Sequence, residues 1–410
     1  MLKKPKKIRE VYADHAATTY IDSRVFLAMK PYLTEHFGNP SSLYGIGRIA
    51  NGVLNDSRRK IAGLIHALPE NIIFTGSGTE SDNMAVFGIA RVNEKHGKHI
   101  ISTSIEHHAV LHPLEELRKQ GWEITYISTN KQGVVKAEDV IRAVRPDTVL
   151  ITIMYANNEV GSIQPVAEIG RKLLQLRKET SKPYPFFHTD ACQAAGYLDL
   201  DVEKLHVDLM TINAGKIYGP KGIGMLYVRR AVALKPIIFG GGQERKMRSG
   251  TENVAGIVGL AKAFELVQQN RQKESERIRG LAKYFWELIQ KEIPKVKLNG
   301  PEIGDGRLAN NLNITIMDIE GEAMLLYLDE YGIMCSTGSA CTSESLEPSY
   351  VLRAMGLPYE YAHGSLRFSF GRCNSKNDVD YIMEYLPGII KTLREISPVN
   401  LSARIHARYK

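Results

Sequence analysis

Lys216 is the residue whose surroundings most clearly suit chemistry. It follows an apolar run over 207–212 that has the composition of a buried strand. The glycines and the proline of 219–224 then prevent a regular helix, so the lysine lies at a strand end in a tight turn. Burial lowers the pKa of an ammonium group and exposes the amine as a nucleophile, which suits Schiff-base chemistry. The same turn also suits a solvated surface lysine, and this stretch alone fits both interpretations.

A loop of glycine and hydroxyl residues, Thr-Gly-Ser-Gly-Thr over 75–79, follows the apolar run 72–74. A helical pattern comes next, so N–H groups and hydroxyls near Gly78 and Thr79 can bind a phosphate at the positive end of a helix. A plain turn has the same composition and is the commoner arrangement. The loop lacks the lysine of a Walker motif, so it does not indicate a nucleoside triphosphate.

An acid, amides and an imidazole follow other apolar runs. Asp190 ends the run 186–189, where a carboxylate is costly unless it meets a cation, and Gln193 follows three residues later. Asn158 belongs to a pair of amides after another run, and His107 follows a third, although a lone histidine is more often structural. Together with the loop and the lysine, these groups match what pyridoxal phosphate requires, with the acid on its pyridinium nitrogen.

The four cysteines form neither a paired framework nor a Cys-x-x-Cys motif, which favours a reducing cytoplasm. Cys341 lies among serine, threonine and glycine residues, so we expect an exposed thiol there. Cys335 and Cys192 have apolar neighbours and are predicted to be packing thiols, whereas the neighbours of Cys373 favour neither environment. No histidine–cysteine spacing indicates a zinc site, and no intrinsic metal is expected.

The chain has 410 residues, which suffices for one large domain and a smaller companion. Its formal net charge of +8 suits an acidic partner, but much of that charge lies near the two ends. The first ten residues are basic and are expected to form a solvated tail rather than a nucleic-acid-binding arm. No apolar run is long enough to span a bilayer and no leader resembles a signal peptide, so we expect no membrane association.

Strand and helix patterns alternate from residue 72 to residue 228. This alternation predicts an α/β fold with a largely parallel sheet covered by helices, and such sheets bind ligands at the carboxyl ends of their strands. Single helices are expected over 23–36 and over 254–291, and short strands then mix with helices as in an α+β domain. We predict a basic tail over 1–10, a large domain over 11–260 whose first residues pack with the small domain, and a small domain over 261–410 that carries the cysteine loop.

The sequence closely resembles the cysteine desulfurases of the NifS/IscS group. These are pyridoxal-phosphate enzymes of fold type I and belong to the class V aminotransferase superfamily. The resemblance runs from about residue 11 to residue 397. It implies a large domain with a mostly parallel seven-stranded sheet, a pyridoxal 5′-phosphate cofactor and a homodimer. The motifs that carry it are YADHAATT, FGNPSS, FTGSGTESDN, EHHAV, NNEVG, HTDACQ, GKIYGPKGIG, RSGTEN, STGSACTSESLEPSYVLRAMG and SLRFSFGR.

The resemblance also implies roles for individual residues. Lys216 would form the Schiff base with the cofactor, Asp190 would pair with the pyridinium nitrogen, and His107 would stack on the ring and help to move protons. Cys341 would take the substrate sulfur as a persulfide, and would also be a transient ligand to an iron–sulfur cluster. The cofactor-binding residues would be Gly78, Thr79, His107, Asn158, Asp190, Gln193, Asn213, Lys216 and Thr251 of the partner subunit.

Two further residues would bind the substrate: Arg367 would hold its carboxylate, with Asn39 nearby. The sequence departs from the family before the lysine, where Ser-x-His is usual and both side chains reach the phosphate. Here the two positions are Asn213 and Gly215. Asn213 can still donate a hydrogen bond, but Gly215 contributes no side chain, so we expect weaker phosphate binding and a more flexible turn.

The function expected from the resemblance is desulfuration of L-cysteine to L-alanine in the cytoplasm. The sulfur on Cys341 would pass to an iron–sulfur scaffold protein or to a tRNA-thiolation partner, without direct nucleic-acid binding. Two alternatives use related chemistry: a class V aminotransferase, which needs no loop cysteine, and a selenocysteine lyase, which uses the same machinery. A third alternative is a sulfur-delivery docking protein with weakened catalysis, which Gly215 keeps open.

Overall fold

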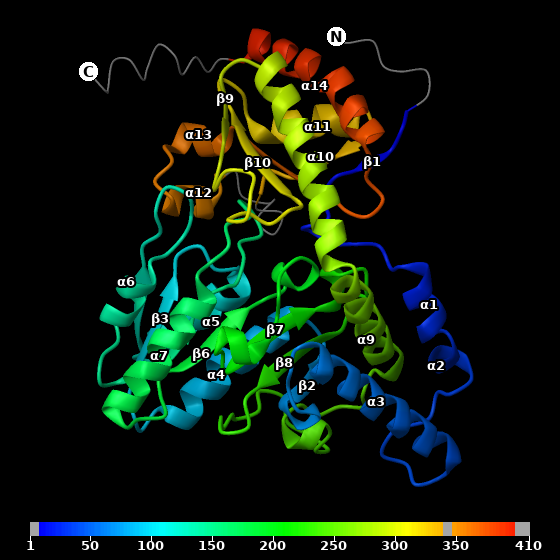
Figure 1. The fold of residues 1–410 in the computed structure, drawn as a ribbon, viewed down its shortest axis with the longest axis vertical. Coiled ribbons are helices and arrows are strands. Elements are labelled where there is room, and N and C mark those ends of the chain that lie inside the picture. Colours follow the sequence, from blue (N-terminus) through cyan, green and yellow to red (C-terminus); the bar gives the residue numbers. More distant parts are fainter. Residues whose placement is uncertain (1–7, 339–346, 398–410) are drawn as a thin grey trace.

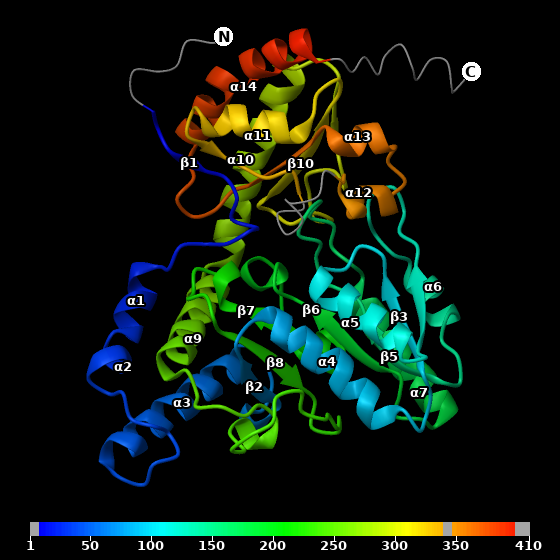
Figure 2. The ribbon, with the colours of Figure 1, turned by 180° about the vertical axis from the view of Figure 1, so that it is seen from behind.

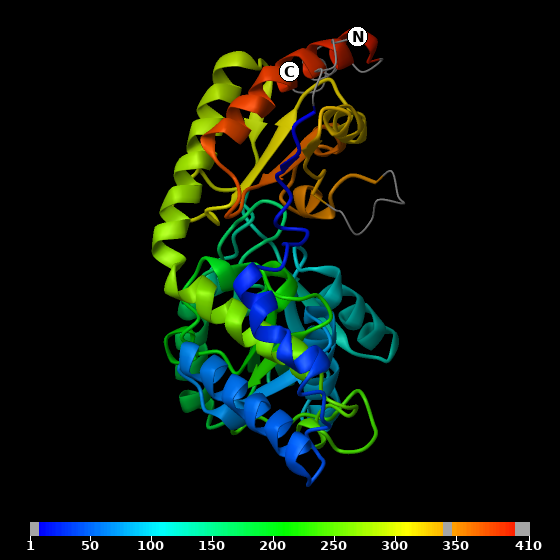
Figure 3. The same ribbon diagram turned by 90° about the vertical axis from the view of Figure 1, so that its right-hand side faces the viewer.

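The computed structural model of the protein describes residues 8–338 and 347–397 (Figure 1). A large body is built on a seven-stranded sheet, and a small body on a three-stranded sheet. The long helix α10 (Arg271–Glu292) and the N-terminal segment connect the two bodies (Figures 1 and 3).

Six strands of the larger sheet run in one direction, and β8 is antiparallel to both of its neighbours. Strands β3, β5 and β6 are buried along their whole length, as expected of a sheet covered on both faces. The carboxyl ends of the six strands therefore meet at one edge, which confirms the predicted α/β fold. The spatial order is β2 (Ile72–Thr75), β8 (Gly224–Val228), β7 (Leu209–Asn213), β6 (Phe186–Asp190), β5 (Thr148–Thr152), β3 (His99–Thr103) and β4 (Glu123–Ile127).

Helices cover both faces of this sheet, and each face has a hydrophobic core of its own. One face is covered by α4 (Gly78–Asn93) and α5 (His108–Lys119), which lie in front of the sheet in Figure 2. The helices on the other face are α3 (Gly45–Leu64), α6 (Ala137–Arg142), α7 (Val166–Thr180), α8 (Val202–Leu205) and α9 (Val254–Gln269). The 3₁₀ turns are Pro69–Asn71, Ala194–Gly196, Ala214–Lys216 and Glu244–Lys246.

Two of the predicted helices are divided. Helices α1 (Ser23–Met29) and α2 (Pro31–Thr34) replace the single helix expected over 23–36, because Pro31 has no N–H with which to continue the bonds of α1. Helices α9 and α10 replace the single helix expected over 254–291, because the chain breaks at Asn270. The Asn270 side chain donates to the oxygen of Leu266 at 3.0 Å and so competes with the backbone of the helix.

The smaller sheet is antiparallel, in the order β12 (Ser365–Ser369), β10 (Asn311–Ile316) and β9 (Val296–Leu298). Helices α10, α11 (Gly321–Asp329) and α14 (Lys376–Ile396) enclose its core, and α12 (Tyr350–Ala354) and α13 (Tyr359–His363) precede β12. The change from one core to the other falls between Val267 and Ile278. We propose on this basis that the boundary between the two domains, predicted at 260/261, falls a few residues later, after Val267. Within 8–338 and 347–397, no helix has the length and apolar content needed to cross a bilayer.

The N-terminal segment belongs to both bodies. Strand β1 (Val11–Tyr12) pairs in parallel with β11 (Ile333–Met334), and Val11 and Ala13 belong to the core of the small body. The chain then descends to the large body (Figure 3), where the N–H of Thr19 donates to the oxygen of Gly215 at 2.9 Å. This course brings residues 14–19 to the carboxyl edge of the larger sheet.

The core of the small body leads to a stability prediction. Phe285 is fully buried, and its ring lies edge-on to those of Phe368 and Phe370, with centroids 5.0 and 5.7 Å away. Phe285→Ala leaves a cavity, so it should lower the free energy of unfolding by about 3–5 kcal/mol, measured by urea denaturation. Leu326, 71% exposed on α11, is the control, and Leu326→Ala should change that free energy by less than about 0.5 kcal/mol. Equal losses in the two variants would contradict the assignment of this core.

Candidate active site

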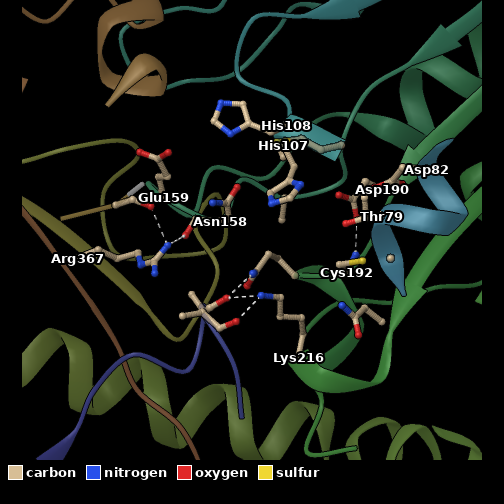
Figure 4. Close-up of a pocket in the computed structure, with 18 of the residues that line it drawn as sticks. Thr79, Asp82, His107, His108, Asn158, Glu159, Asp190, Cys192, Lys216 and Arg367 are labelled. Carbon is tan, nitrogen blue, oxygen red and sulfur yellow. Dashed lines mark hydrogen bonds between the residues drawn. The ribbon is translucent and has the colours of Figure 1, made fainter. Parts of the chain in front are cut away.

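A cavity of about 290 Å³ lies at the carboxyl edge of the larger sheet, where the two bodies meet (Figure 4). Asn39 and Thr251 do not line it: Asn39 is exposed between α2 and α3, and Thr251 is exposed in the loop before α9. Cys341 lies outside the described residues. The other site residues predicted from the sequence all line the cavity: Gly78, Thr79, His107, Asn158, Asp190, Gln193, Asn213, Lys216 and Arg367.

Lys216 follows β7 in a 3₁₀ turn. The side-chain oxygen of Asn213 accepts the N–H of Gly215 at 3.0 Å, and this bond fixes the turn. The Lys216 Nζ donates to the backbone oxygens of Ala16 at 3.1 Å and Ala17 at 2.5 Å, both in the N-terminal segment. The amine therefore lies within the cavity, opposite the N-terminal segment (Figure 4).

Asp190 ends β6 and is 8% exposed. Its Oδ1 accepts the N–H of Cys192 at 2.9 Å, which holds the carboxylate in place. Asp82 of α4 lies behind it, with Oδ1 3.6 Å from the Nε2 of the buried His188. Burial raises the pKa of Asp82 well above its ordinary value and lowers the pKa of His188 to about 4. The neutral forms of both groups are therefore favoured behind Asp190.

His107 caps the N-terminus of α5, where its Nδ1 accepts the N–H of Ala109 at 3.0 Å. A ring nitrogen that accepts carries no proton, so the proton of the neutral ring is on Nε2. Burial lowers the pKa of His107, and the charge of Lys216 acts in the same direction. A neutral imidazole with a donor at Nε2 therefore lines the cavity.

The N-terminus of α4, with Gly78 and Thr79, forms one end of the cavity. A Cβ at Gly78 would lie 2.9 Å from the Sγ of Cys192, so the backbone approaches here as only glycine allows. The carboxylate of Glu80, in the first turn, is paired with Arg248 at 2.8 Å. This pairing offsets a negative charge that would otherwise oppose an anion at the helix terminus.

Arg367 of β12 forms the other end of the cavity and is 2% exposed. Its Nη1 donates to the backbone oxygens of Asn158 at 3.0 Å and Gly338 at 3.2 Å. Its Nη2 donates to the Oδ1 of Asp14 at 2.7 Å. The buried Nε has no hydrogen-bond partner among the residues that the structure describes. The guanidinium thus has at least one N–H, that of Nε, without a partner among the described residues, and it lines the cavity.

The described cysteines are not in disulfides. Cys192 is buried as predicted, but it also lines the cavity, and burial raises the pKa of its thiol well above the ordinary value. Cys335 packs against the core of the small body, and burial raises its pKa. Cys373 is exposed, with Sγ 3.5 Å from the Nε2 of His15. No cluster of histidine, cysteine and acidic residues suited to a metal occurs in the described part of the chain.

Residues 11–382 match the model of the family described as Aminotransferase class-V. The chain belongs to this family. One relative, the cysteine desulfurase IscS of Clostridium botulinum (strain Hall), is 48% identical over 391 residues, which cover 95% of this chain and 97% of the relative. The cysteine desulfurase IscS of Methanosarcina thermophila is 49% identical over 391 residues, or 95% of this chain and 94% of the relative.

Solved structures agree with this assignment to the class-V aminotransferases. A structure named "NIFS-like protein" has a TM-score of 0.87 at 35% identity and covers 94% of this chain and 100% of its own. Another, "SspA in complex with cysteine", has a TM-score of 0.76 at 35% identity and covers 88% of this chain and 98% of its own. These findings confirm the predicted fold type I and the predicted membership of the NifS/IscS cysteine desulfurase group.

Class-V aminotransferases use pyridoxal 5′-phosphate, whose ring withdraws electrons from an amino acid bound through its amine. Three buried polar atoms of the cavity lack a hydrogen-bond partner among the described residues: Asp82 Oδ1, Asn158 Oδ1 and Arg367 Nε. The cavity also offers a helix N-terminus for a phosphate, a carboxylate for a ring nitrogen and the Lys216 amine for an aldehyde. The residues present therefore fit this cofactor.

The sequence did not single out Asp14, Asp82 or Glu159, which lie at or beside the cavity. Asp82 follows Gly78 by four residues on α4, so helical periodicity could have placed it on the same face. Asp14 meets Arg367 across 353 residues of sequence, and no local pattern predicts such a pair. Glu159 is buried because residues of the small body, such as Ser349, pack against it. The NNEVG motif alone does not predict this contact.

The departure at Gly215 leads to a binding prediction. A Cβ there would have Asn213 Oδ1 at 3.5 Å and Lys221 Cγ at 3.8 Å as its nearest neighbours, so a side chain has room. A neutral hydrogen bond contributes about 0.5–1.5 kcal/mol, so Gly215→His should lower the Kd for pyridoxal phosphate by up to about tenfold. Titration of the apoprotein followed by absorbance measures the Kd. Gly215→Ala, which adds no donor, is the control, and weaker binding by Gly215→His would mean that the turn requires glycine.

Proposed function

We propose that this protein is a cysteine desulfurase that converts L-cysteine to L-alanine and carries the sulfur on Cys341. The observation that carries the proposal is a pair of groups on one cavity, the Lys216 amine and the Arg367 guanidinium, whose Nε has no partner in the described part of the chain. An α-amino acid has an amine and a carboxylate on one carbon, and these two groups are complementary to it. The full-length likeness to cysteine desulfurases, and to a protein solved in complex with cysteine, supports cysteine as that amino acid.

The positions around the cavity support a role for each residue toward the cofactor. Lys216 would carry its aldehyde carbon, Asp190 would keep a proton on the ring nitrogen, and His107 would lie against the ring. Gln193 and Asn158 would bind the ring hydroxyl. The phosphate would be held by Gly78, Thr79 and Asn213 at the N-terminus of α4.

In this proposal Lys216 accepts a proton and His107 donates one. The Lys216 Nζ would take the proton from the substrate Cα, and the oxygens of Ala16 and Ala17 orient this amine in the cavity. The Nε2–H of His107 is then a donor on the same cavity. Arg367 would hold the carboxylate during this proton transfer, so that the Cα stays close to the amine.

Cys341 takes the sulfur. Its thiolate attacks the substrate sulfur, an S–S bond forms, and the C–S bond breaks with its electron pair left on carbon. That carbon takes a proton, so one cysteine and one enzyme thiol give one alanine and one persulfide. The persulfide sulfur then passes to the thiol of an iron–sulfur scaffold or of a tRNA-thiolation protein. A reducing compartment, the cytoplasm, suits this chemistry, and the unpaired state of the described cysteines supports it.

We propose a homodimer in which Thr251 of the partner subunit completes the phosphate site. Thr251 lies in a loop anchored by the pair of Arg248 with Glu80, in the first turn of α4, and is itself exposed. Large apolar side chains are also exposed on the large body, among them Phe37 at 73% and Leu43 at 89%. Exposed apolar groups of this kind favour an interface between subunits.

The lysine is tested by labelling. Lys216→Ala should lose turnover and the absorbance of bound cofactor, because no other amine would replace it. Borohydride reduction of the wild type should place the label on the peptide of Lys216. Lys221, whose Nζ donates to the oxygen of Thr19 at 2.8 Å, is the matched control, and Lys221→Ala should still be labelled at Lys216. Label on Lys221 would overturn the assignment.

The function is tested by incubating the wild type with L-cysteine and dithiothreitol, which should yield alanine and sulfide in equal amounts. Cys341→Ser should still bind the cofactor and respond to cysteine by a change in absorbance. It should release almost no sulfide and form no persulfide, because the accepting thiol is gone.

Cys335→Ser is the matched control, since this thiol packs against the core of the small body. It should keep most of the activity and lose about 1–2 kcal/mol of stability. Persulfide found by mass spectrometry on Cys335, or sulfide released normally by Cys341→Ser, would contradict the assignment. Formation of 3-mercaptopyruvate from L-cysteine, only when a 2-oxo acid is supplied to take the amine, would favour an aminotransferase instead.

A further inference from the structure

The carboxylate of Asp14 occupies part of the surface on Arg367 that a substrate carboxylate needs. Nη2 of Arg367 donates to Asp14, and Nη1 is bound to the oxygens of Asn158 and Gly338. Only Nε lacks a partner among the described residues. A bidentate carboxylate binds two parallel N–H groups of a guanidinium, and Nε forms such a pair with Nη2. A substrate that engages Nε in this way therefore also approaches Nη2, the nitrogen to which Asp14 is bound.

We propose that the carboxylate of Asp14 competes with the substrate carboxylate for Arg367. Asp14 leaves Nη2 when an amino acid binds, and this competition lowers the affinity of the site for the amino acid. The proposal rests on the proposed function, in which Arg367 binds the carboxylate of cysteine. Asp14 is in this view a positioning residue: it touches Arg367 and not the reacting atoms.

Two carboxylates lie near Arg367, and their surroundings decide which one can move. Glu159 is 1% exposed and accepts a hydrogen bond from the hydroxyl of Ser349, which is itself the N-cap of α12. The side chain of Asp14 is 16% exposed, and the one hydrogen bond described for its carboxylate is that to Arg367. Asp14 can therefore turn toward water, whereas Glu159 cannot do so without leaving a buried polar group unpaired.

The charges around Arg367 explain why Asp14 binds it in the absence of substrate and why this contact lowers the affinity for substrate. Without Asp14, the guanidinium would be buried with fewer partners before substrate arrives, which is unfavourable for a charge. With Asp14 in place, a substrate carboxylate would be repelled by a like charge in a site of low dielectric constant. Asp14 thus keeps Arg367 oriented at the expense of substrate affinity, and removal of its charge should favour the substrate.

The test is Asp14→Asn in the holoenzyme. The KM for L-cysteine should fall by about three- to tenfold, as expected when one competing hydrogen bond to a charged group is weakened, while kcat changes by less than about twofold. The Kd for L-alanine, measured by calorimetry, should fall by a similar factor. The Kd for L-alaninamide, which has no carboxylate, should not change. If Asp14 had only a structural role, its substitution would change the Kd for L-alanine and the Kd for L-alaninamide by similar factors.

Asp22→Asn is the matched control. Asp22 lies in the same N-terminal segment and forms an ion pair with Arg372 of the small body at 3.0 Å, but does not line the cavity. It should lose stability and leave the KM unchanged. Asp14→Ser, which is also neutral, repeats the measurement if Asp14→Asn is poorly folded.

The outcomes separate this inference from the proposed function. A higher or unchanged KM and alanine Kd in Asp14→Asn would overturn the exchange, and a higher value would mean that Asp14 orients Arg367 for the substrate. If the wild type releases no alanine from cysteine, the proposed function fails. The comparison of L-alanine with L-alaninamide still decides whether Asp14 competes at Arg367.

Discussion

A guanidinium that is almost wholly buried must be hydrogen-bonded, because an unpaired buried charge is costly. Arg367 meets this requirement with groups from three separate segments, namely Asp14 of the N-terminus, Asn158 after β5 and Gly338 after β11. The large and small bodies are thus joined through one buried positive charge. The geometry of the cavity depends on this junction, since Arg367 and Asn158 both line it.

The position of Lys216 in the cavity depends on the same N-terminal segment. Oxygens of Ala16 and Ala17 accept from Lys216, and Gln193 also donates to Ala16, at 2.9 Å. A segment that carries no catalytic side chain therefore orients both the Lys216 amine and the Arg367 guanidinium. Small residues at 16 and 17 allow this close approach of the backbone.

The sequence predicts those parts of the fold that follow from local chemistry. Apolar runs such as 186–189 become buried strands, and polar residues at their ends, such as Asp190, gather at one edge because the strands are parallel. The break at Asn270 was missed because a side chain there competes for the backbone of a helix whose pattern continues on both sides. Neither the pair of Asp14 with Arg367 nor the exposed position of Asn39 has a local signal, since both depend on how distant segments pack.

The pairing of β1 with β11 has a consequence for synthesis on the ribosome. Val11 is translated early, but its partner Ile333 emerges only after both halves of the larger sheet, and Arg367 emerges later still. The nascent chain can therefore assemble the larger sheet while its first strand remains unpaired and its apolar residues stay exposed. The pocket therefore cannot be completed before Arg367 has been translated.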